Sequence, residues 1–163
     1  MTYYAGSFCP PTYGHAHILE KYLQNHASIV VVCSRNPNKD DNWFTPEQCK
    51  QMWEIYIREI ILRKRAYISV HTYDEIKHWA LIGPLTMIRG LRSEEELVNE
   101  VDVLKLNPLF DQFIYVRSDP EMKDISSTKA RKLLASGGNL SGILHPKVEE
   151  MCKKFLKENN NGK

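Results

Sequence analysis

The sequence predicts an α/β fold in which helices wind around both faces of a five-stranded parallel sheet. Short apolar segments alternate along the chain with segments of helical periodicity, and the connections between them are short. The run Ser28–Ser34 is apolar and rich in β-branched residues, which is typical of a central strand buried on both faces. No linker or repeat divides the chain, so we expect a single domain over residues 1–158 and a frayed tail over 159–163.

The first half of the chain contains one strand on either side of a predicted helix. The first strand is expected at Tyr3–Ala5, and a glycine-containing loop leads from it into a helix at Ala16–Leu23. After the second strand, Thr45 is a predicted helix N-cap, because Pro46 suits the first helical position and Gln48 completes a capping box.

The second half continues the alternation. Ser93 and Glu96 form a second capping box, and Gly137 is expected to end a later helix. The remaining strands are predicted at Tyr67–His71, Leu85–Ile88 and Gln112–Val116, and the remaining helices at Asp74–Leu81, after Ser93, at Ser127–Leu134 and at Pro146–Glu158.

The composition excludes several classes of protein. The chain has 163 residues, 42% of them hydrophobic, and a formal net charge of +2, so we expect neither a nucleic-acid nor a membrane partner. No signal-peptide pattern precedes the first strand, and the four cysteines form no C-x-x-C pair, so we expect a cytoplasmic protein without a structural metal site or disulfide framework.

The loop from Gly6 to His15 is the most informative segment. A strand, a glycine-containing turn and a helix start place free backbone N–H groups and the positive end of a helix dipole together, which favours phosphate binding. The loop is not a Walker loop, because no lysine follows Gly14, and it lacks the third glycine of the dinucleotide fingerprint.

Polar side chains follow several of the predicted parallel strands, whose carboxyl ends share one edge of the sheet, where ligands bind. Cations, an imidazole and hydroxyls at this edge suit a triphosphate and a second phosphate. The side chains that the topology brings there are Ser7, His15, Lys39, Arg89, Arg92, Ser126, Ser127 and Thr128.

These residues suit nucleotidyl transfer, in which a phosphate oxygen attacks the α-phosphorus of a nucleoside triphosphate and pyrophosphate leaves. We expect His15 to donate a hydrogen bond to the α-phosphate in the transition state and Arg92 to bind the β- and γ-phosphates. Lys39 and Arg89 would neutralise the incoming phosphate. The alternatives are solvated arginines paired with Glu94–Glu96, a solvated Lys39, a His15 that serves only as a helix cap or packed ring, and a simple helix N-cap at Ser126–Thr128.

The segment G-S-F-x-P-x-T-x-G-H, from Gly6 to His15, resembles the signature of the T/H-x-G-H nucleotidyltransferase superfamily, and in particular the bacterial-type phosphopantetheine adenylyltransferase family. Asn36–Lys39 resembles this family's phosphate-binding lysine loop, and Ile88–Arg92 resembles its most diagnostic segment. Gly137–Gly142 is also similar to a family segment. Departures are Cys9, where the family has aspartate, and Asn99, where it usually has tyrosine.

The resemblance implies a Rossmann-like nucleotidyltransferase sheet and roles for individual residues. It assigns catalysis to His15, Lys39, Arg89 and Arg92, and acceptor binding to Ser7, Lys39 and Arg89. The ATP-binding residues that it implies are Ser7, Phe8, His15, Gly90, Leu91, Arg92, Glu100, Ile125, Ser126, Ser127 and Thr128.

The reaction that the resemblance implies joins ATP and 4′-phosphopantetheine into dephospho-coenzyme A and pyrophosphate, with Mg²⁺ held mainly by the ATP phosphates. It also implies a homo-oligomer, a hexamer in this family. Alternatives are another phosphate acceptor, such as nicotinamide mononucleotide or a sugar or alcohol phosphate, with ATP or CTP, and a non-catalytic nucleotide-binding module of the same fold.

Overall fold

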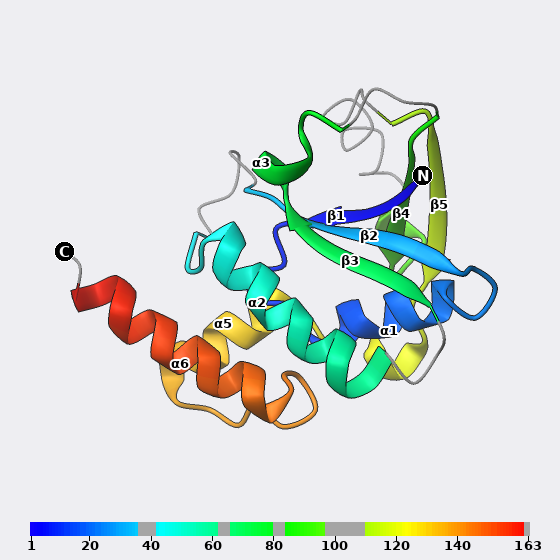
Figure 1. Cartoon of the computed structure of the whole chain (residues 1–163). Coiled ribbons are helices and arrows are strands. Elements are labelled where there is room, and N and C mark those ends of the chain that lie inside the picture. The colour runs from blue at the N-terminus through cyan, green and yellow to red at the C-terminus, as the bar shows by residue number, and fades with distance from the viewer. Residues whose placement is uncertain (36–41, 62–65, 80–83, 97–109, 162–163) are drawn as a thin grey trace.

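The computed structural model describes residues 1–35, 42–61, 66–79, 84–96 and 110–161. Its sheet contains the strands β1 (Thr2–Gly6), β2 (Ser28–Cys33), β3 (Tyr67–Thr72), β4 (Thr86–Leu91) and β5 (Gln112–Arg117). All pairings are parallel and the order is β3-β2-β1-β4-β5 (Figure 1). This confirms the predicted five-stranded parallel sheet.

The helices keep the labels of Figure 1. Short turns η1 and η2 have π-helical and 3₁₀ geometry. The bounds are α1 (Tyr13–Tyr22), α2 (Pro46–Tyr56), η1 (Ile57–Ile61), α3 (Tyr73–Ile76), η2 (Pro120–Met122), α5 (Ser127–Ser136) and α6 (Pro146–Asn161).

Helix termini follow the local chemistry that the sequence indicates. The Thr45 hydroxyl accepts a hydrogen bond from Gln48 N at 3.2 Å, and Gln48 Oε1 accepts one from Thr45 N at 3.0 Å, so the predicted capping box at the start of α2 is confirmed. Gly137 ends α5 with φ of 69°, a left-handed conformation that glycine adopts without steric cost.

Several boundaries differ from the sequence-based prediction. Helix α1 begins at Tyr13 and not at Ala16, and β4 continues to Leu91, so that Arg89 lies within the strand and not after it. Helix α6 extends past Glu158 to Asn161. The Asn159 side-chain amide explains this extension, because it donates a hydrogen bond to Trp43 O at 3.1 Å and ties the end of the helix to the protein.

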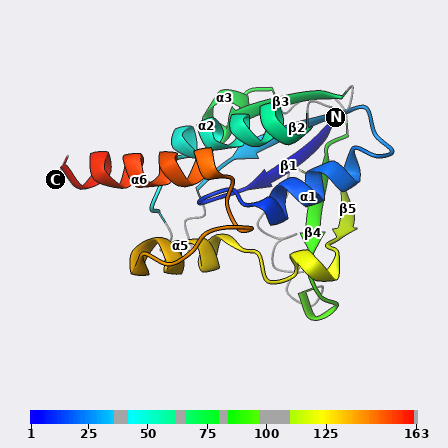
Figure 2. The ribbon, with the colours of Figure 1, turned by 90° about the horizontal axis from the view of Figure 1, so that it is seen from below.

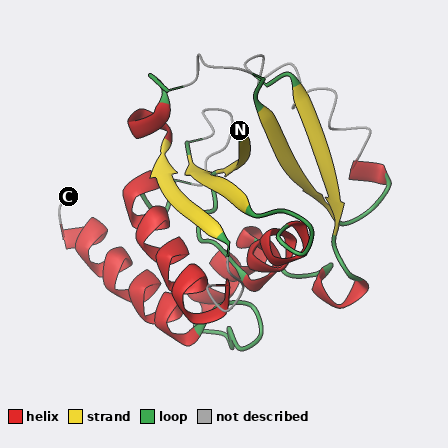
Figure 3. Ribbon diagram, turned by 45° about the vertical axis from the view of Figure 1, so that its right-hand side comes forward, coloured by secondary structure: helices red, strands yellow, loops and turns green. Residues whose placement is uncertain are grey.

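Helices α1, α2, α5 and α6 gather on one face of the sheet, and α6 lies alongside α2 (Figures 1 and 2). Their apolar side chains form the main core with one face of β1, β2 and β4. On the opposite face, Tyr3, Val30 and Val32 pack with Ile76 of α3. Figure 3 shows the same separation of strands from the main group of helices. Among the described residues, no helix is both long and apolar enough to cross a membrane.

The strand order of the sheet reverses between β1 and β4. The chain moves from β1 to β2 and β3 on one side, and then returns to β4 and β5 on the other. Ligands of such sheets bind beyond the carboxyl ends of the strands at the point where the order reverses. The pairing of β1 with β4 ends at Tyr3 and Met87, so the carboxyl ends of the two strands border this point without pairing.

Candidate active site

Phe8 supports the loop that follows β1. Its φ of 45° lies in the left-handed region, which a bulky residue rarely adopts. The ring is buried and packs edge-on against Trp53 with centroids 5.1 Å apart and against the His15 ring at 5.2 Å. The strained backbone of Phe8 therefore places an aromatic wall between the core and the imidazole of His15.

Thr12 fixes the orientation and the tautomer of His15. Its backbone N–H donates a hydrogen bond to His15 Nδ1 at 3.1 Å, and its hydroxyl oxygen lies 3.0 Å from the same nitrogen. A backbone N–H can only donate, so Nδ1 is the acceptor and the neutral ring carries its hydrogen on Nε2. The Nε2–H group is then available as a donor to a phosphate oxygen.

Burial, and secondarily the positive charge of Arg92, lowers the pKa of His15 to about 4. Both effects disfavour the imidazolium form. At neutral pH His15 is therefore a neutral hydrogen-bond donor, a role that suits stabilisation of a transferring phosphoryl group and does not require a change of protonation state.

The pKa shift of His15 predicts acid sensitivity. The unfolded chain binds a proton at His15 near pH 6.5, whereas the folded chain binds it only near pH 4, so unfolding is favoured progressively as the pH falls through this window. Urea unfolding at pH 7.5 and pH 5 should show a larger loss of unfolding free energy for the wild type than for His15→Asn. Equal losses of unfolding free energy in the two proteins would contradict the lowered pKa of His15.

Two arginines of β4 and the segment after it lie near the same region. Arg89 and Arg92 both lower the pKa of the Tyr4 phenol electrostatically, although burial raises that pKa overall. Arg92 also acts on His15. Arg92 is therefore near enough to both His15 and Tyr4, and Arg89 near enough to Tyr4, for their charges to act on these side chains.

Arg92 is paired with Glu96. Its Nε and Nη2 atoms each lie 3.0 Å from Glu96 Oε1, and its backbone N–H donates to Glu96 Oε2 at 2.7 Å. This is the ion pair that the sequence offers as the alternative to phosphate binding. The predicted Ser93–Glu96 capping box is not formed as expected, because the Glu96 carboxylate reaches the Arg92 backbone.

Glu96 competes for the guanidinium that we assign to the triphosphate. Replacing Glu96 with glutamine keeps its size and removes its charge, so Glu96→Gln should lower the KM for ATP about two- to fivefold, because a partly exposed ion pair is worth only ~0.2–1 kcal/mol. Steady-state kinetics at varied ATP measures the change. Glu94→Gln is a nearby control, and an unchanged or higher KM for ATP in Glu96→Gln would show that Arg92 does not exchange partners.

Two glycines allow the elements of the site to approach closely. A Cβ added at Gly14 would lie 2.8 Å from Ile125 O, and one added at Gly90 would lie 2.9 Å from Ile18 Cγ1. Gly14 therefore permits the segment before α5 to contact the first turn of α1, and Gly90 permits β4 to contact α1. Side chains at these positions would separate the walls of the site.

The start of α5 is tied to the loop after β1. Ser126 caps the helix by accepting from Lys129 N at 3.1 Å, and the Ser127 hydroxyl donates to Pro10 O at 2.8 Å. Arg131 Nη1 donates to Cys9 O at 2.6 Å and Nη2 to Thr128 Oγ1 at 3.3 Å. The predicted cap at Ser126 is confirmed, and the start of α5, which carries three hydroxyls, lies against the Gly6–His15 loop.

Cys9 lies where the phosphopantetheine adenylyltransferase family has aspartate, and its thiol accepts a hydrogen bond from the backbone. Its buried thiol lies 3.4 Å from Phe44 N, which donates to the sulfur. A hydrogen bond from the Cys49 side chain is the main cause that lowers the pKa of the Cys9 thiol.

Some predicted site residues lie outside the described part of the chain, and sequence reasoning missed others. Lys39, Asn99 and Glu100 lie outside the described residues. Thr12 and Arg131 are the residues that sequence reasoning missed. Thr12 has a signal in the sequence, since it is the threonine of T-x-G-H, whereas nothing local distinguishes Arg131 from other helix-surface arginines.

The sequence comparisons agree with this geometry. The profile of the cytidylyltransferase-like family matches residues 3–133. A protein of Rhizobium rhizogenes named phosphopantetheine adenylyltransferase is 27% identical over 165 residues, covering 96% of this chain and 96% of that protein. A Brucella ovis protein of the same name is 27% identical over 146 residues, covering 84% and 86%.

Solved structures with the same fold include nicotinic acid mononucleotide adenylyltransferase of Plasmodium falciparum complexed with NaAD. It is 20% identical, with a TM-score of 0.65 over 99% of this chain and 98% of that chain. A bifunctional NMN adenylyltransferase/ADP ribose pyrophosphatase of Francisella tularensis, complexed with AMP and a manganese ion, has a TM-score of 0.61 at 18% identity and matches 98% of this chain and 52% of its own.

The family profile covers most of the chain, including the Gly6–His15 loop, β4 and most of α5. The curated relatives match it over nearly their full length and carry the name of an adenylyltransferase. The chain belongs to the cytidylyltransferase-like family and is a nucleotidyltransferase.

Proposed function

We propose that this enzyme transfers the adenylyl group of ATP to 4′-phosphopantetheine, forming dephospho-coenzyme A and pyrophosphate. The observation that carries the proposal is the neutral His15, near Arg92 and at the point where the strand order of the sheet reverses. Curated relatives of the chain are named for this reaction.

In this mechanism the enzyme acts mainly by positioning and electrostatics. The acceptor phosphate is already anionic, so it can attack the α-phosphorus without a strong base. His15 Nε2–H would donate to the α-phosphate oxygens as negative charge builds on them. Arg92 would exchange Glu96 for the β- and γ-phosphates, and Arg89 would hold the acceptor phosphate, together with Ser7 and Lys39.

The nucleotide would lie between α1 and α5. Ile125 contacts the first turn of α1, and the hydroxyls of Ser126–Thr128 begin the neighbouring helix. Backbone N–H groups and helix dipoles at such helix starts favour phosphates. Phe8, Gly90, Leu91 and Glu100 complete the ATP-binding set that we propose.

Mg²⁺ would enter with ATP, held by the nucleotide and by water and not by the described side chains. Within the described ranges, no three His, Cys, Asp or Glu side chains are grouped so that they could hold a metal ion. Oxygen ligands from phosphates and water are the usual partners of Mg²⁺ in such reactions. The divalent cation would supply charge neutralisation, while the residues named above orient the two substrates.

Pyrophosphate release with ATP and a panel of phosphate acceptors tests the proposal. We expect turnover with 4′-phosphopantetheine and a product with the mass of dephospho-coenzyme A. Turnover with nicotinamide mononucleotide and none with 4′-phosphopantetheine would reject this acceptor. Nucleotide binding without turnover of any acceptor, with ATP or CTP, would instead favour a non-catalytic module.

Nicotinic acid mononucleotide is a second candidate acceptor. It is favoured by the similarity of the whole fold to the Plasmodium falciparum enzyme that is named for it. The same assay separates the two candidates, because each product has its own mass.

We also propose that the enzyme is a cytoplasmic homo-oligomer, a hexamer by resemblance to the family. Light scattering of the purified protein measures the mass of the assembly, and a monomeric mass would reject this part of the proposal.

A further inference from the structure

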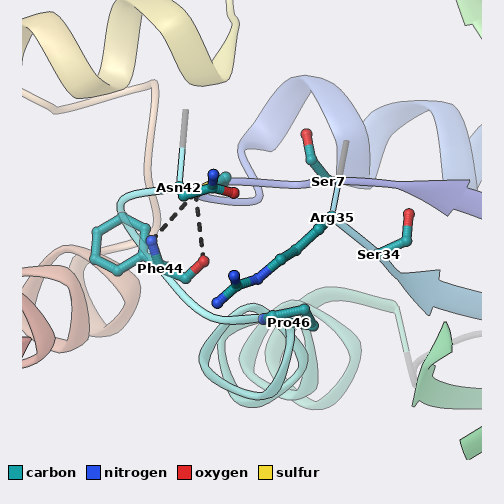
Figure 4. A pocket seen from close by; sticks show the side chains of 7 residues that line it. Ser7, Ser34, Arg35, Asn42, Phe44 and Pro46 are labelled. Carbon is teal, nitrogen blue, oxygen red and sulfur yellow. Dashed lines mark hydrogen bonds between the residues drawn. The ribbon is translucent and has the colours of Figure 1, made fainter. Parts of the chain in front are cut away.

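A small pocket opens beside Ser7, on the side of β1 that faces away from Arg89 and Arg92. Its polar lining includes Ser7, Ser34, Arg35 and Asn42, and Pro46 of α2 closes one wall (Figure 4). Ser7 and Ser34 are neighbours because they follow the paired residues Gly6 and Cys33, and Ser34 N donates to Gly6 O at 3.0 Å. The pocket therefore lies between the carboxyl ends of β1 and β2.

The Arg35 side chain extends across this pocket towards Pro46 (Figure 4). No hydrogen bond or ion pair links Arg35 to another described residue, and no aspartate or glutamate is among the described residues that line the pocket. Arg92, by contrast, is paired with Glu96. The described lining of the pocket thus combines a guanidinium that no described residue pairs with, two hydroxyls and a side-chain amide, a donor set that recognises an anionic oxygen group.

The position of the pocket distinguishes the two phosphates of the reaction. Arg35 follows β2 and Arg89 lies on β4, so the two arginines are on opposite sides of the central strand β1. The triphosphate belongs to the β4 side, where His15, Arg92 and the start of α5 converge. The acceptor phosphate, which Arg89 and Ser7 would hold, must meet this triphosphate over the end of β1, where Arg35 would reach it from the β2 side.

We propose that Arg35 binds the phosphate of the acceptor, with Ser7 and Ser34 as hydroxyl donors beside it. The inference rests on the proposed function, because it assigns a ligand to the acceptor side of the same site. It adds a phosphate-binding cation that lies outside the segments on which the family resemblance rests. The ligand class is a phosphomonoester, and the positive end of α2 adds a favourable potential.

Steady-state kinetics of Arg35→Gln, with ATP and 4′-phosphopantetheine varied in turn, tests the assignment. The KM for the acceptor should rise about ten- to a hundredfold, as for the loss of one charged hydrogen bond, while kcat and the KM for ATP change less than about twofold. Arg35→Lys should recover part of the affinity, because it keeps the charge. An unchanged acceptor KM, or an increase confined to the KM for ATP, would overturn the assignment.

Arg58→Gln is the matched control. Arg58 is exposed, lies in η1 beyond the far end of α2 and pairs with Glu59, so its replacement should leave every kinetic constant unchanged. Thermal unfolding of both variants should match the wild type, because Arg35 is also exposed. An increase in acceptor KM of the same size in Arg58→Gln would show a general charge effect and overturn the inference.

Calorimetric titration of the enzyme with inorganic phosphate, without ATP, separates this inference from the proposed function. If the wild type turns over 4′-phosphopantetheine and Arg35→Gln does so with the same KM, the inference fails and the function stands. If the wild type shows no turnover, the function fails. Weaker phosphate binding by Arg35→Gln would then still support the anion site, and phosphate binding that is equal in both proteins, or absent, would overturn it.

Discussion

Replacing His15 with alanine should lower kcat about a hundred- to a thousandfold, with a much smaller change in the affinity for ATP. The imidazole is held by the backbone N–H of Thr12, is neutral at physiological pH and can donate through Nε2. Removing one preorganised donor to charge that develops in the transition state has an effect of this size. Rapid-mix or steady-state pyrophosphate release, with equilibrium binding of ATP, measures both quantities.

His26→Ala is the control for this variant. His26 stacks on Tyr22 with ring centroids 3.9 Å apart at the opposite end of α1, so its loss should not affect turnover. His15→Asn adds a second comparison, because it keeps a side-chain donor in place of the ring and should be less impaired than His15→Ala. A His15→Ala enzyme with nearly normal kcat would remove His15 from the chemistry.

Replacing Trp53 with alanine should lower the free energy of unfolding by about 3–5 kcal/mol, the range for removing a large aromatic residue from a packed core. Trp53 is fully buried and packs edge-on against Tyr4, Phe8 and Tyr56. Its indole N–H has no hydrogen-bond partner among the described residues, so the cost comes from the cavity and not from a broken hydrogen bond. Urea unfolding followed by circular dichroism measures the loss.

Trp79→Ala is the matched substitution at the surface. Trp79 is 49% exposed and makes its ring contact with His71, so its loss should change stability by no more than about 0.5 kcal/mol. Because the Trp53 ring also supports Phe8, which packs against His15, the Trp53 variant should lose activity below its unfolding transition as well. Similar unfolding free energies for the two variants would contradict the burial of Trp53.

The sheet was predictable because its determinants are local and repeated. The apolar run of β2 can be buried only in the middle of a parallel sheet, and the Thr45, Pro46 and Gln48 sequence specifies one helix start. Boundaries that depend on partners distant in the sequence were missed. The extension of β4 through Arg89 depends on pairing with β5, which continues to Arg117.

The site was predictable to the extent that topology determines it. Residues that follow parallel strands must share one edge of the sheet, so the nearness of Arg92 to His15 could be expected. The ion pair of Arg92 with Glu96 was one of two alternatives that residue types could not separate. The anchoring of α5 by Arg131 on Cys9 O joins residues far apart in the chain and leaves no periodic trace in the sequence.

A crystal structure with 4′-phosphopantetheine and a non-hydrolysable ATP analogue tests the central claim most directly. We predict that the α-phosphate lies within hydrogen-bonding distance of His15 Nε2, with the acceptor phosphate on the β2 side of β1, close enough for in-line attack. A triphosphate bound away from His15, or two ligands on separate surfaces of the sheet, would contradict the account.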